Sequence, residues 1–273
     1  MRTSKNLGEL KILAKSIRKN VIEILVPSVS HHIGCSLGII EILTVLYGNV
    51  MKIFPKDPKN VDRDIFILSK GHGAVALYST LYNLGYFKKK LLMSYDAEGT
   101  IIPEHASTNV PGVEVSTGSL GHGLPIGLGF SFSFLRDDKK NKVFVLMSDG
   151  ELNEGSNWEA IQYAGHHKVN NLTIIIDKNN FQGLSDTKSV IDLDPLDAKF
   201  KVFGWNVIEV DGNNIEELLK VFSTKTSSNT PKPLCIIANT IKGKGVSSME
   251  GKFESHYKSL SKEVKEEIIN ELS

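Results

Sequence analysis

Hydrophobic residues recur at helical spacing along the first third of the chain. In the segment 7–25 an apolar side chain returns every three or four residues, which predicts an amphipathic helix that Pro27 ends. Ser36 is a suitable N-cap for a second helix that runs to about Val50. A third helix is predicted over about 74–84, where Gly85 supplies the stop.

Further along, short apolar runs alternate with helical segments at 157–167 and 215–222. The runs have the unbroken hydrophobicity of strands that are buried on both faces. Such strands, separated by helices, form a parallel sheet with right-handed crossovers. The predicted fold is therefore α/β, a doubly wound, mostly parallel sheet with helices on both faces, and its ligand is expected at the carboxyl ends of the strands. The predicted strands are 63–69, 142–147, 172–177, 205–210 and 234–238.

Composition narrows the class of protein. The chain has 273 residues, of which 41% are hydrophobic and 23% charged. This length fits one large α/β domain or two small ones, and we expect a single domain over residues 1–273, ending in a helix at 261–272. With 32 basic and 31 acidic residues, nothing favours nucleic acid or an anionic membrane as a partner. Two distant cysteines, no signal-peptide pattern and no apolar run near the ~20 residues of a membrane span favour a cytoplasmic protein.

Two polar loops follow neighbouring predicted strands, Ser148–Glu151 and Asp177–Phe181. Because parallel strands end at the same edge of a sheet, Asp149 and Asn179 are expected to lie close together. Their carboxylate and amide oxygens, with a backbone carbonyl, suit Mg²⁺ or Ca²⁺. Gly150 lets a diphosphate approach the free N–H groups where a helix starts. Each loop by itself is also an ordinary turn, but together they predict a metal–diphosphate site.

The two loops resemble the signature of thiamine diphosphate enzymes, Gly-Asp-Gly followed one strand–helix–strand unit later by Asn-Asn, with Ser148 in place of the first Gly. The wider sequence resembles the transketolase family in order and spacing, from about residue 10 to residue 260. The segments that carry this resemblance are Leu68–His72, Pro111–Gly123, Asp149–Ala160, Thr240–Val246 and His256.

The resemblance implies the parts of a cofactor site. Asp149, Asn179 and the backbone oxygen of Phe181 match the ligands of Mg²⁺ or Ca²⁺, and Gly150 matches a backbone contact to the diphosphate. The remaining cofactor positions are His72 and His256 on the diphosphate side, Gly118, Ser119 and Leu120 against the aminopyrimidine, and Glu154 at the contact with a partner domain. In such a site thiamine diphosphate supplies the carbanion chemistry, and the protein positions it.

Three histidines are the candidate catalytic residues. His32 matches the histidine of the family's Gly-His-Pro-Gly segment, although Ile33 replaces the proline, and His105 matches a second family histidine with less agreement around it. His256 faces the substrate in the family pattern as well as the diphosphate. Contact with substrate hydroxyls and proton transfer suit a side chain that titrates near neutral pH.

The resemblance covers the diphosphate-binding half of a transketolase. The family's other domain grips the pyrimidine and carries the glutamate that activates the cofactor, and we expect no room for it after Asn239. The implied protein is the diphosphate-binding subunit of a two-chain transketolase, which transfers a two-carbon ketol unit from a ketose to an aldose. Its partner would be a C-terminal subunit with the pyrimidine domain, in an α2β2 assembly that acts on sugars or sugar phosphates.

The sequence leaves four alternatives open. The histidine set argues against the first, a subunit of a 2-oxoacid dehydrogenase. The second is a transketolase-like enzyme of nucleotide-sugar or surface-polysaccharide synthesis. The third is a nicotinamide dehydrogenase, because Gly71–Ala76 fits G-x-G-x-x-A, but no strand with an acidic end follows at the expected distance. The fourth is a binding module without catalysis, against which the retained Asp149, Asn179 and histidines weigh.

Overall fold

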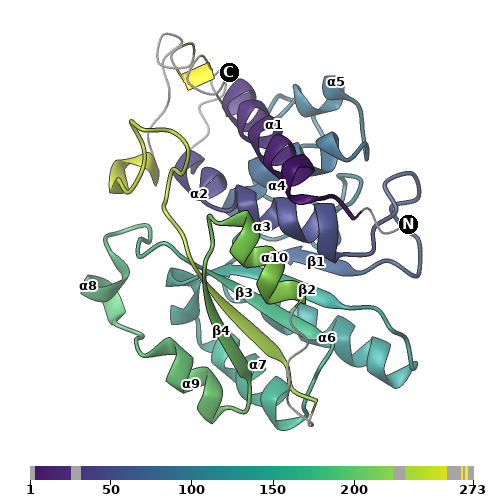
Figure 1. The fold of residues 1–273 in the computed structure, drawn as a ribbon, viewed down its shortest axis with the longest axis vertical. Coiled ribbons are helices and arrows are strands. Elements are labelled where there is room, and N and C mark those ends of the chain that lie inside the picture. The colour runs from purple at the N-terminus through teal and green to yellow at the C-terminus, as the bar shows by residue number, and fades with distance from the viewer. Residues whose placement is uncertain (1–3, 26–31, 224–230, 257–265, 267, 270–273) are drawn as a thin grey trace.

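The computed structural model describes residues 4–25, 32–223, 231–256, 266 and 268–269. Among these residues it contains a sheet of five parallel strands in the order β1-β2-β3-β5-β4 (Figure 1). The strands are β1 (Ile65–Leu68), β2 (Val143–Ser148), β3 (Leu172–Lys178), β4 (Asn206–Asp211) and β5 (Leu234–Asn239). Each overlaps one predicted strand, so the predicted α/β fold with a parallel sheet is confirmed.

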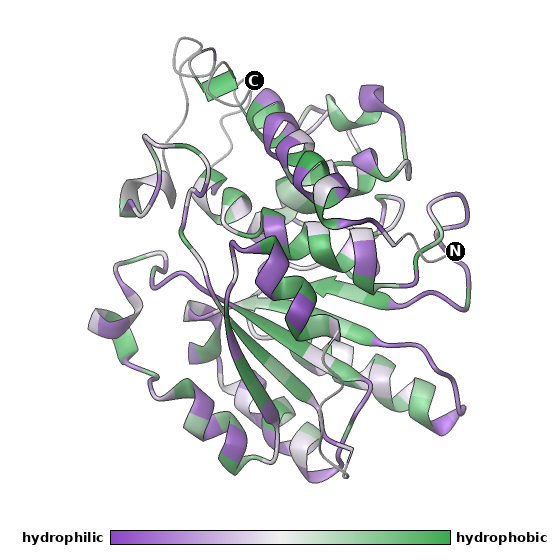
Figure 2. Cartoon of the chain, in the orientation of Figure 1, coloured by the Kyte–Doolittle hydropathy of each residue, from purple (hydrophilic) through white to green (hydrophobic). Residues whose placement is uncertain are grey.

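Successive side chains of a strand enter two different hydrophobic cores. In β1, Phe66 and Leu68 pack into one core, whereas Ile65 and Ile67 pack into the other. Neighbouring side chains of a strand point to opposite faces, so a strand covered on both faces is apolar at every position. The central strands accordingly carry hydrophobic colour along their length in Figure 2.

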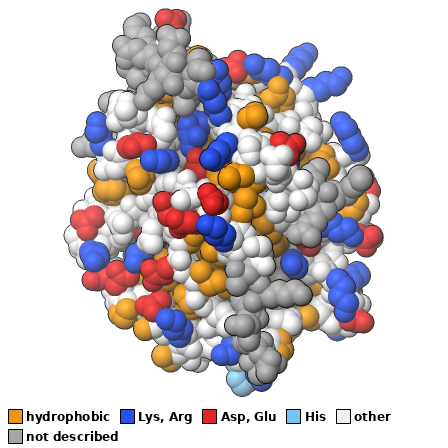
Figure 3. Space-filling view, viewed as in Figure 1, with side chains coloured by type: hydrophobic (Ala, Val, Ile, Leu, Met, Phe, Trp, Pro, Cys, Tyr) orange, Lys and Arg blue, Asp and Glu red, His pale blue; other side chains and the backbone are white. Residues whose placement is uncertain are grey.

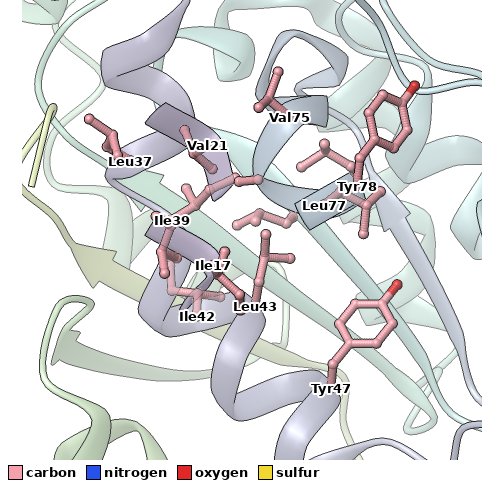
Figure 4. Close-up of a cluster of buried hydrophobic side chains, with 14 of the residues drawn as sticks. Ile17, Val21, Leu37, Ile39, Ile42, Leu43, Tyr47, Val75, Leu77 and Tyr78 are labelled. Carbon is pink, nitrogen blue, oxygen red and sulfur yellow. The ribbon is translucent and has the colours of Figure 1, made fainter. Parts of the chain in front are cut away.

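Helices cover both faces of the sheet (Figure 1). The first core contains side chains of α1 (Leu7–Leu25), α3 (Ile40–Val45), α4 (Ala74–Asn83) and α10 (Ile215–Ser223), several of which Figure 4 shows packed together. The second core contains side chains of α6 (Gly123–Arg136), α7 (Gly155–His166) and α9 (Leu196–Val202). The remaining helical elements are α2 (Ile33–Leu37), η1 (Leu46–Val50), η2 (Gly71–Gly73), α5 (Lys89–Leu92), η3 (Gly150–Asn153), α8 (Thr187–Ile191) and η4 (Phe253–His256).

The second predicted helix starts elsewhere than the N-cap rule indicated. Ser36 lies inside α2 and is 1% exposed, while His32 occupies the cap position with a left-handed backbone, φ 70°. Ile33 is buried in the first core, and this packing begins the helix before the serine. A turn at Gly38 then separates α2 from α3.

Helix α6 falls in a stretch, 86–141, to which the sequence pattern assigned no element. Glycine and proline lower helix propensity, and α6 contains Pro125, Gly127 and Gly129. Gly127 has a tertiary role, because a Cβ there would lie 2.6 Å from Cγ2 of Val145 on β2. The helix therefore depends on close contact with the sheet, which local sequence does not reveal. The predicted helix at 261–272 lies almost entirely outside the described residues.

One segment, Ile33–Val50, is apolar and long enough to cross a membrane by length and composition. In the structure 89% of it is buried within the protein, and its side chains belong to the first core. This burial accounts for its hydropathy. On the face shown in Figure 3, basic and acidic side chains are interspersed, with hydrophobic side chains between them.

Candidate functional site

Loops from distant parts of the chain enclose a cavity of about 230 Å³ at the carboxyl ends of β1, β2 and β3. This is the edge of the sheet where a ligand was expected. Eight of the predicted site residues line the cavity: His32, His72, His105, Gly118, Leu120, Gly150, Asn179 and Phe181. The structure thus brings most of the predicted site together.

Three histidines form a cluster in the cavity wall. The ring centroid of His32 lies 5.1 Å from that of His72 and 6.3 Å from that of His105. The Tyr78 hydroxyl fixes the loop that carries His105, because it donates to the backbone oxygen of that residue at 2.8 Å. Enclosure by protein lowers the pKa of His72, opposed by a hydrogen bond with Cys35. A neutral imidazole beside two others can accept a proton or contact a hydroxyl.

The loop 118–121 lies against this cluster. A Cβ at Gly118 would lie 3.1 Å from Cδ2 of His105, so glycine lets the imidazole pack closely against the loop. Ser119 is exposed and lines an adjoining surface groove rather than the cavity. Glu154 is also exposed, and its Cβ lies beside Gly121, whose φ is +84°. Ser119 and Glu154 therefore belong to the rim of the site.

The three predicted metal ligands lie on consecutive strand ends. Asp149 follows β2 and is 5% exposed; Asn179 follows β3 and is 6% exposed. The carboxylate of Asp149 accepts from the backbone N–H of Gly150 at 2.8 Å and of Asn180 at 2.7 Å. Oδ1 of Asn179 accepts from the backbone N–H of Phe181 at 3.0 Å. The bond between Asn180 and Asp149 joins the two loops, and each of the other two bonds stabilises the turn of its own loop.

This donor set suits a hard divalent cation. A carboxylate has about four acceptor positions, of which Asp149 uses two in these bonds. Burial and the charge of Asp177 raise the pKa of Asp149 to about 7, and a bound cation would favour its ionised form. No cluster of three His, Cys, Asp or Glu side chains suited to a metal occurs among the described residues. The candidate site therefore relies on amide and backbone oxygens, as Mg²⁺ and Ca²⁺ sites commonly do.

A buried ion pair lies behind these candidate ligands, and sequence reasoning did not identify it. Lys70, fully buried, pairs with the carboxylate of Asp177, which also accepts from the Thr240 hydroxyl. Nδ2 of Asn179 donates to the same carboxylate at 3.0 Å. The sequence contained an indication of this ion pair. Asp177 is an acidic residue at the end of a largely apolar predicted strand, and buried carboxylates are rare unless they are paired.

Glu151 is a second missed carboxylate, fully buried in the cavity wall. Its side chain accepts from the Ser69 hydroxyl at 2.5 Å and from the N–H of Gly121 at 3.0 Å on one oxygen. The other oxygen accepts from the N–H of Ser148 at 3.3 Å. Glu151 thereby joins the ends of β1 and β2 to the loop 118–121. Burial raises the pKa of this carboxyl.

Gly150 and His256 complete the set of predicted positions. A Cβ at Gly150 would lie 2.8 Å from Cβ of Gln182, so the glycine is required by packing as well as by any ligand. His256 belongs to η4, which packs against α2, and its side chain is outside the described residues. Lys242, also missed, is a buried cation 5.6 Å from the ring centroid of Phe181, and burial lowers its pKa.

Comparison with known proteins identifies the family. Residues 10–271 match the family model described as transketolase, thiamine diphosphate binding domain. The chain belongs to the transketolase family. A solved transketolase from Campylobacter jejuni superimposes on it with a TM-score of 0.91 at 30% identity, over 98% of this chain and 43% of that chain. Human transketolase is 36% identical over 97% of this chain and 42% of its own length.

Relatives of similar length are named as transketolase subunits. An apulose-4-phosphate transketolase subunit of Phocaeicola vulgatus is 38% identical over 97% of this chain and 94% of its own length. The 6-deoxy-6-sulfo-D-fructose transketolase subunit SqwG of a Clostridium species is 37% identical over 97% of this chain and 96% of its own length. The chain thus spans nearly all of these subunits but less than half of the single-chain transketolases.

These findings confirm the function predicted from the sequence: a thiamine diphosphate-binding transketolase subunit, with two-carbon ketol transfer as the family reaction. Because these relatives are named as one subunit of a transketolase, a partner subunit is implied. Gly71–Gly73 do follow β1 and precede α4, as the dehydrogenase alternative requires, but the family match assigns this turn to a transketolase fold. A role in nucleotide-sugar or surface-polysaccharide synthesis, the second alternative, fits these relatives no better than a transketolase subunit does.

Proposed function

We propose that this transketolase subunit is a single domain, residues 1–273, that holds the diphosphate and its divalent cation at the strand edge. The observation that carries the proposal is the meeting of two groups in one cavity wall: the cluster of His32, His72 and His105, and the loop after β3 that carries Asn179 and Phe181. Asp149, on the loop after β2, lies directly behind this wall, where its carboxylate accepts from the N–H of Asn180 at 2.7 Å. Asp149, Asn179 and the Phe181 carbonyl would hold Mg²⁺ or Ca²⁺.

Each part of the chain then has a chemical task. Gly150 opens the backbone to the diphosphate, and the family resemblance assigns His72 and His256 to that side. The loop Gly118, Ser119 and Leu120 is proposed to lie against the aminopyrimidine, with Glu154 at its outer rim. When bound, thiamine diphosphate supplies the carbanion chemistry. His32, His105 and His256 would contact substrate hydroxyls and move protons through their ring nitrogens.

We further propose that a C-terminal subunit carrying the pyrimidine domain completes the enzyme in an α2β2 assembly in the cytoplasm. Such a partner is supported by the relatives of similar length, which are named as transketolase subunits. Its substrates would be sugars or sugar phosphates, a class to which the compounds named for two relatives belong. Neither nucleic acid nor a membrane is expected as a partner.

Calorimetry on the full chain tests the cofactor site. Thiamine diphosphate should bind in the presence of Mg²⁺ and much more weakly after chelation of the metal. Asp149→Ala should abolish the magnesium-dependent part, because it removes the charged ligand. Asp62→Ala, at an exposed aspartate in the turn before β1, is the control and should bind as the wild type does. Binding that survives both chelation and Asp149→Ala would overturn the proposed metal site.

A further inference from the structure

Asp177 is a buried carboxylate at the centre of the strand edge. Its side chain is 1% exposed, and it is not among the residues that line the cavity. In β3 it pairs in register with Ser148 of β2 and Ala238 of β5. It therefore lies between the loop that carries Asp149 and the loop that carries Thr240, one layer behind the candidate ligands.

Both oxygens of this carboxylate are engaged. Oδ2 accepts from Nζ of Lys70 and from Nδ2 of Asn179, and Oδ1 accepts from the hydroxyl of Thr240. Its backbone oxygen accepts from the N–H of Asp149 at 3.2 Å. Lys70 is itself fully buried, so the pair is a desolvated ion pair with hydrogen bonds to both oxygens. Such a pair costs desolvation energy, which raises the question of what it does.

This arrangement determines how the side-chain amide of Asn179 is oriented. A primary amide has an oxygen end and a nitrogen end of nearly equal size, and only its hydrogen bonds decide which way it faces. An ionised carboxylate only accepts, so Asp177 selects the nitrogen end. Oδ1 of Asn179 then faces the other way, where it accepts from the N–H of Phe181 at 3.0 Å. A reversed amide would present N–H groups to a cation.

We propose that Asp177 is a positioning residue for the metal site: it fixes the amide of Asn179 with the oxygen toward the cation, while Lys70 and Thr240 hold Asp177 in place. The inference rests on the proposed function, because it takes Asn179 as a ligand of the divalent cation. Residues that orient metal ligands typically change metal affinity by about 10- to 100-fold when they are replaced.

Two double variants separate orientation from charge. Lys70→Met with Asp177→Leu removes the ion pair and every acceptor for Nδ2 of Asn179 at this position. Lys70→Gln with Asp177→Asn also removes both charges but keeps an amide oxygen that can accept from Asn179. Mg²⁺ is titrated by calorimetry at fixed thiamine diphosphate, in the assembly of the full chain with its partner subunit. Thermal unfolding without cofactor reports whether each variant keeps the fold.

The first double variant should need about 10- to 100-fold more Mg²⁺ for half-saturation, and the second less than about threefold more. Equal shifts in the two variants, or no shift in either, would overturn the inference. A wild-type assembly without magnesium-dependent binding would overturn the proposed function and this inference with it, and it is recognised because the wild type itself fails.

A gentler pair of variants applies if the first double variant does not fold. Thr240→Val has nearly the shape of threonine but lacks the hydroxyl that holds Oδ1 of Asp177, whereas Thr240→Ser keeps it. Thr240→Val should weaken Mg²⁺ binding several-fold, and Thr240→Ser should restore it. Equal Mg²⁺ affinity in these two variants would contradict a role for Asp177 in placing Asn179.

Discussion

Glu151 and Glu154 stand three positions apart and meet opposite environments. Glu151 is fully buried and accepts from Ser69, Gly121 and Ser148, whereas Glu154 is exposed at the rim. The sequence resemblance singled out Glu154, because it matches a family position. Glu151 has the stronger structural reason for being a carboxylate, since all of these partners are donors.

Replacing Glu151 tests this difference. Glu151→Gln turns one acceptor oxygen into a donor that faces another N–H, which should destabilise the fold by about 1–3 kcal/mol. Glu154→Gln, the matched control at the surface, should change stability by less than about 0.5 kcal/mol. Urea unfolding measures both values. A Glu151→Gln variant as stable as the control would show that the three donors find other partners.

His72 should make stability depend on pH. Because enclosure lowers its pKa in the folded chain, the unfolded chain binds this proton more readily below the ordinary pKa of about 6.5. The contribution is therefore fully present above that pH and is lost as the pH falls toward the lowered pKa. Cofactor-free wild type should lose stability relative to His72→Gln between about pH 7.5 and pH 5. Parallel unfolding curves over this range would contradict the expected shift.

At the scale of elements, each strand end delivers one part of the site. The loop after β1 carries Lys70 and His72, the loop after β2 carries Asp149, and the loop after β3 carries Asn179. Parallel register brings these loops to one edge. Helix α6 covers the face of the sheet opposite α4 and follows directly after the loop 118–121. Its contact with the sheet therefore also sets where that loop ends.

The glycines of α6 provide a matched pair of sites. Gly127→Ala should destabilise the protein by about 1–3 kcal/mol, because the added Cβ meets the side chain of Val145 on β2. Gly129→Ala has open space around it and should instead stabilise the helix by about 0.5–1 kcal/mol. Thermal or urea unfolding shows whether each variant is more or less stable than the wild type. The same sign at both positions would contradict the packing argument.

At the scale of the whole molecule, the chain corresponds to one part of a larger enzyme. It spans less than half of the single-chain transketolases and nearly all of the subunits that resemble it. The rim residues Ser119 and Glu154 lie exposed beside the cavity. We therefore expect a partner to cover this rim when the enzyme assembles.

Activity should depend on that assembly. The full chain by itself should show negligible ketol transfer, because we expect the pyrimidine domain, which carries the activating glutamate in the family, to belong to the partner subunit. Adding the subunit that carries the pyrimidine domain should restore transfer and yield a complex with two copies of each chain. A ketose–aldose transfer assay and light scattering measure the two outcomes. Robust transfer by the purified single chain would contradict the expected division of the enzyme.

Much of the fold could be predicted from local sequence. The runs Val143–Met147 of β2 and Ile174–Ile176 of β3 are apolar at every position because both faces of the sheet are covered, so the strands could be recognised from hydropathy. Their alternation with helices then indicated the parallel arrangement. Helix α6 could not be predicted, because its glycines are tolerated for contacts with β2 that lie outside any local window. The start of α2 was misplaced for the same reason, the burial of Ile33.

The sequence by itself indicated the family, and it predicted the candidate oxygen ligands and histidines, because these depend on residue type and on order along the chain. The tertiary structure decided which groups meet. It placed Asp177 behind Asn179, and it buried Lys70 and Glu151 among their partners. Such partners lie on different strands and loops, far apart along the chain. Only packing of the strands in register brings them within hydrogen-bonding distance, so no local pattern could have shown them.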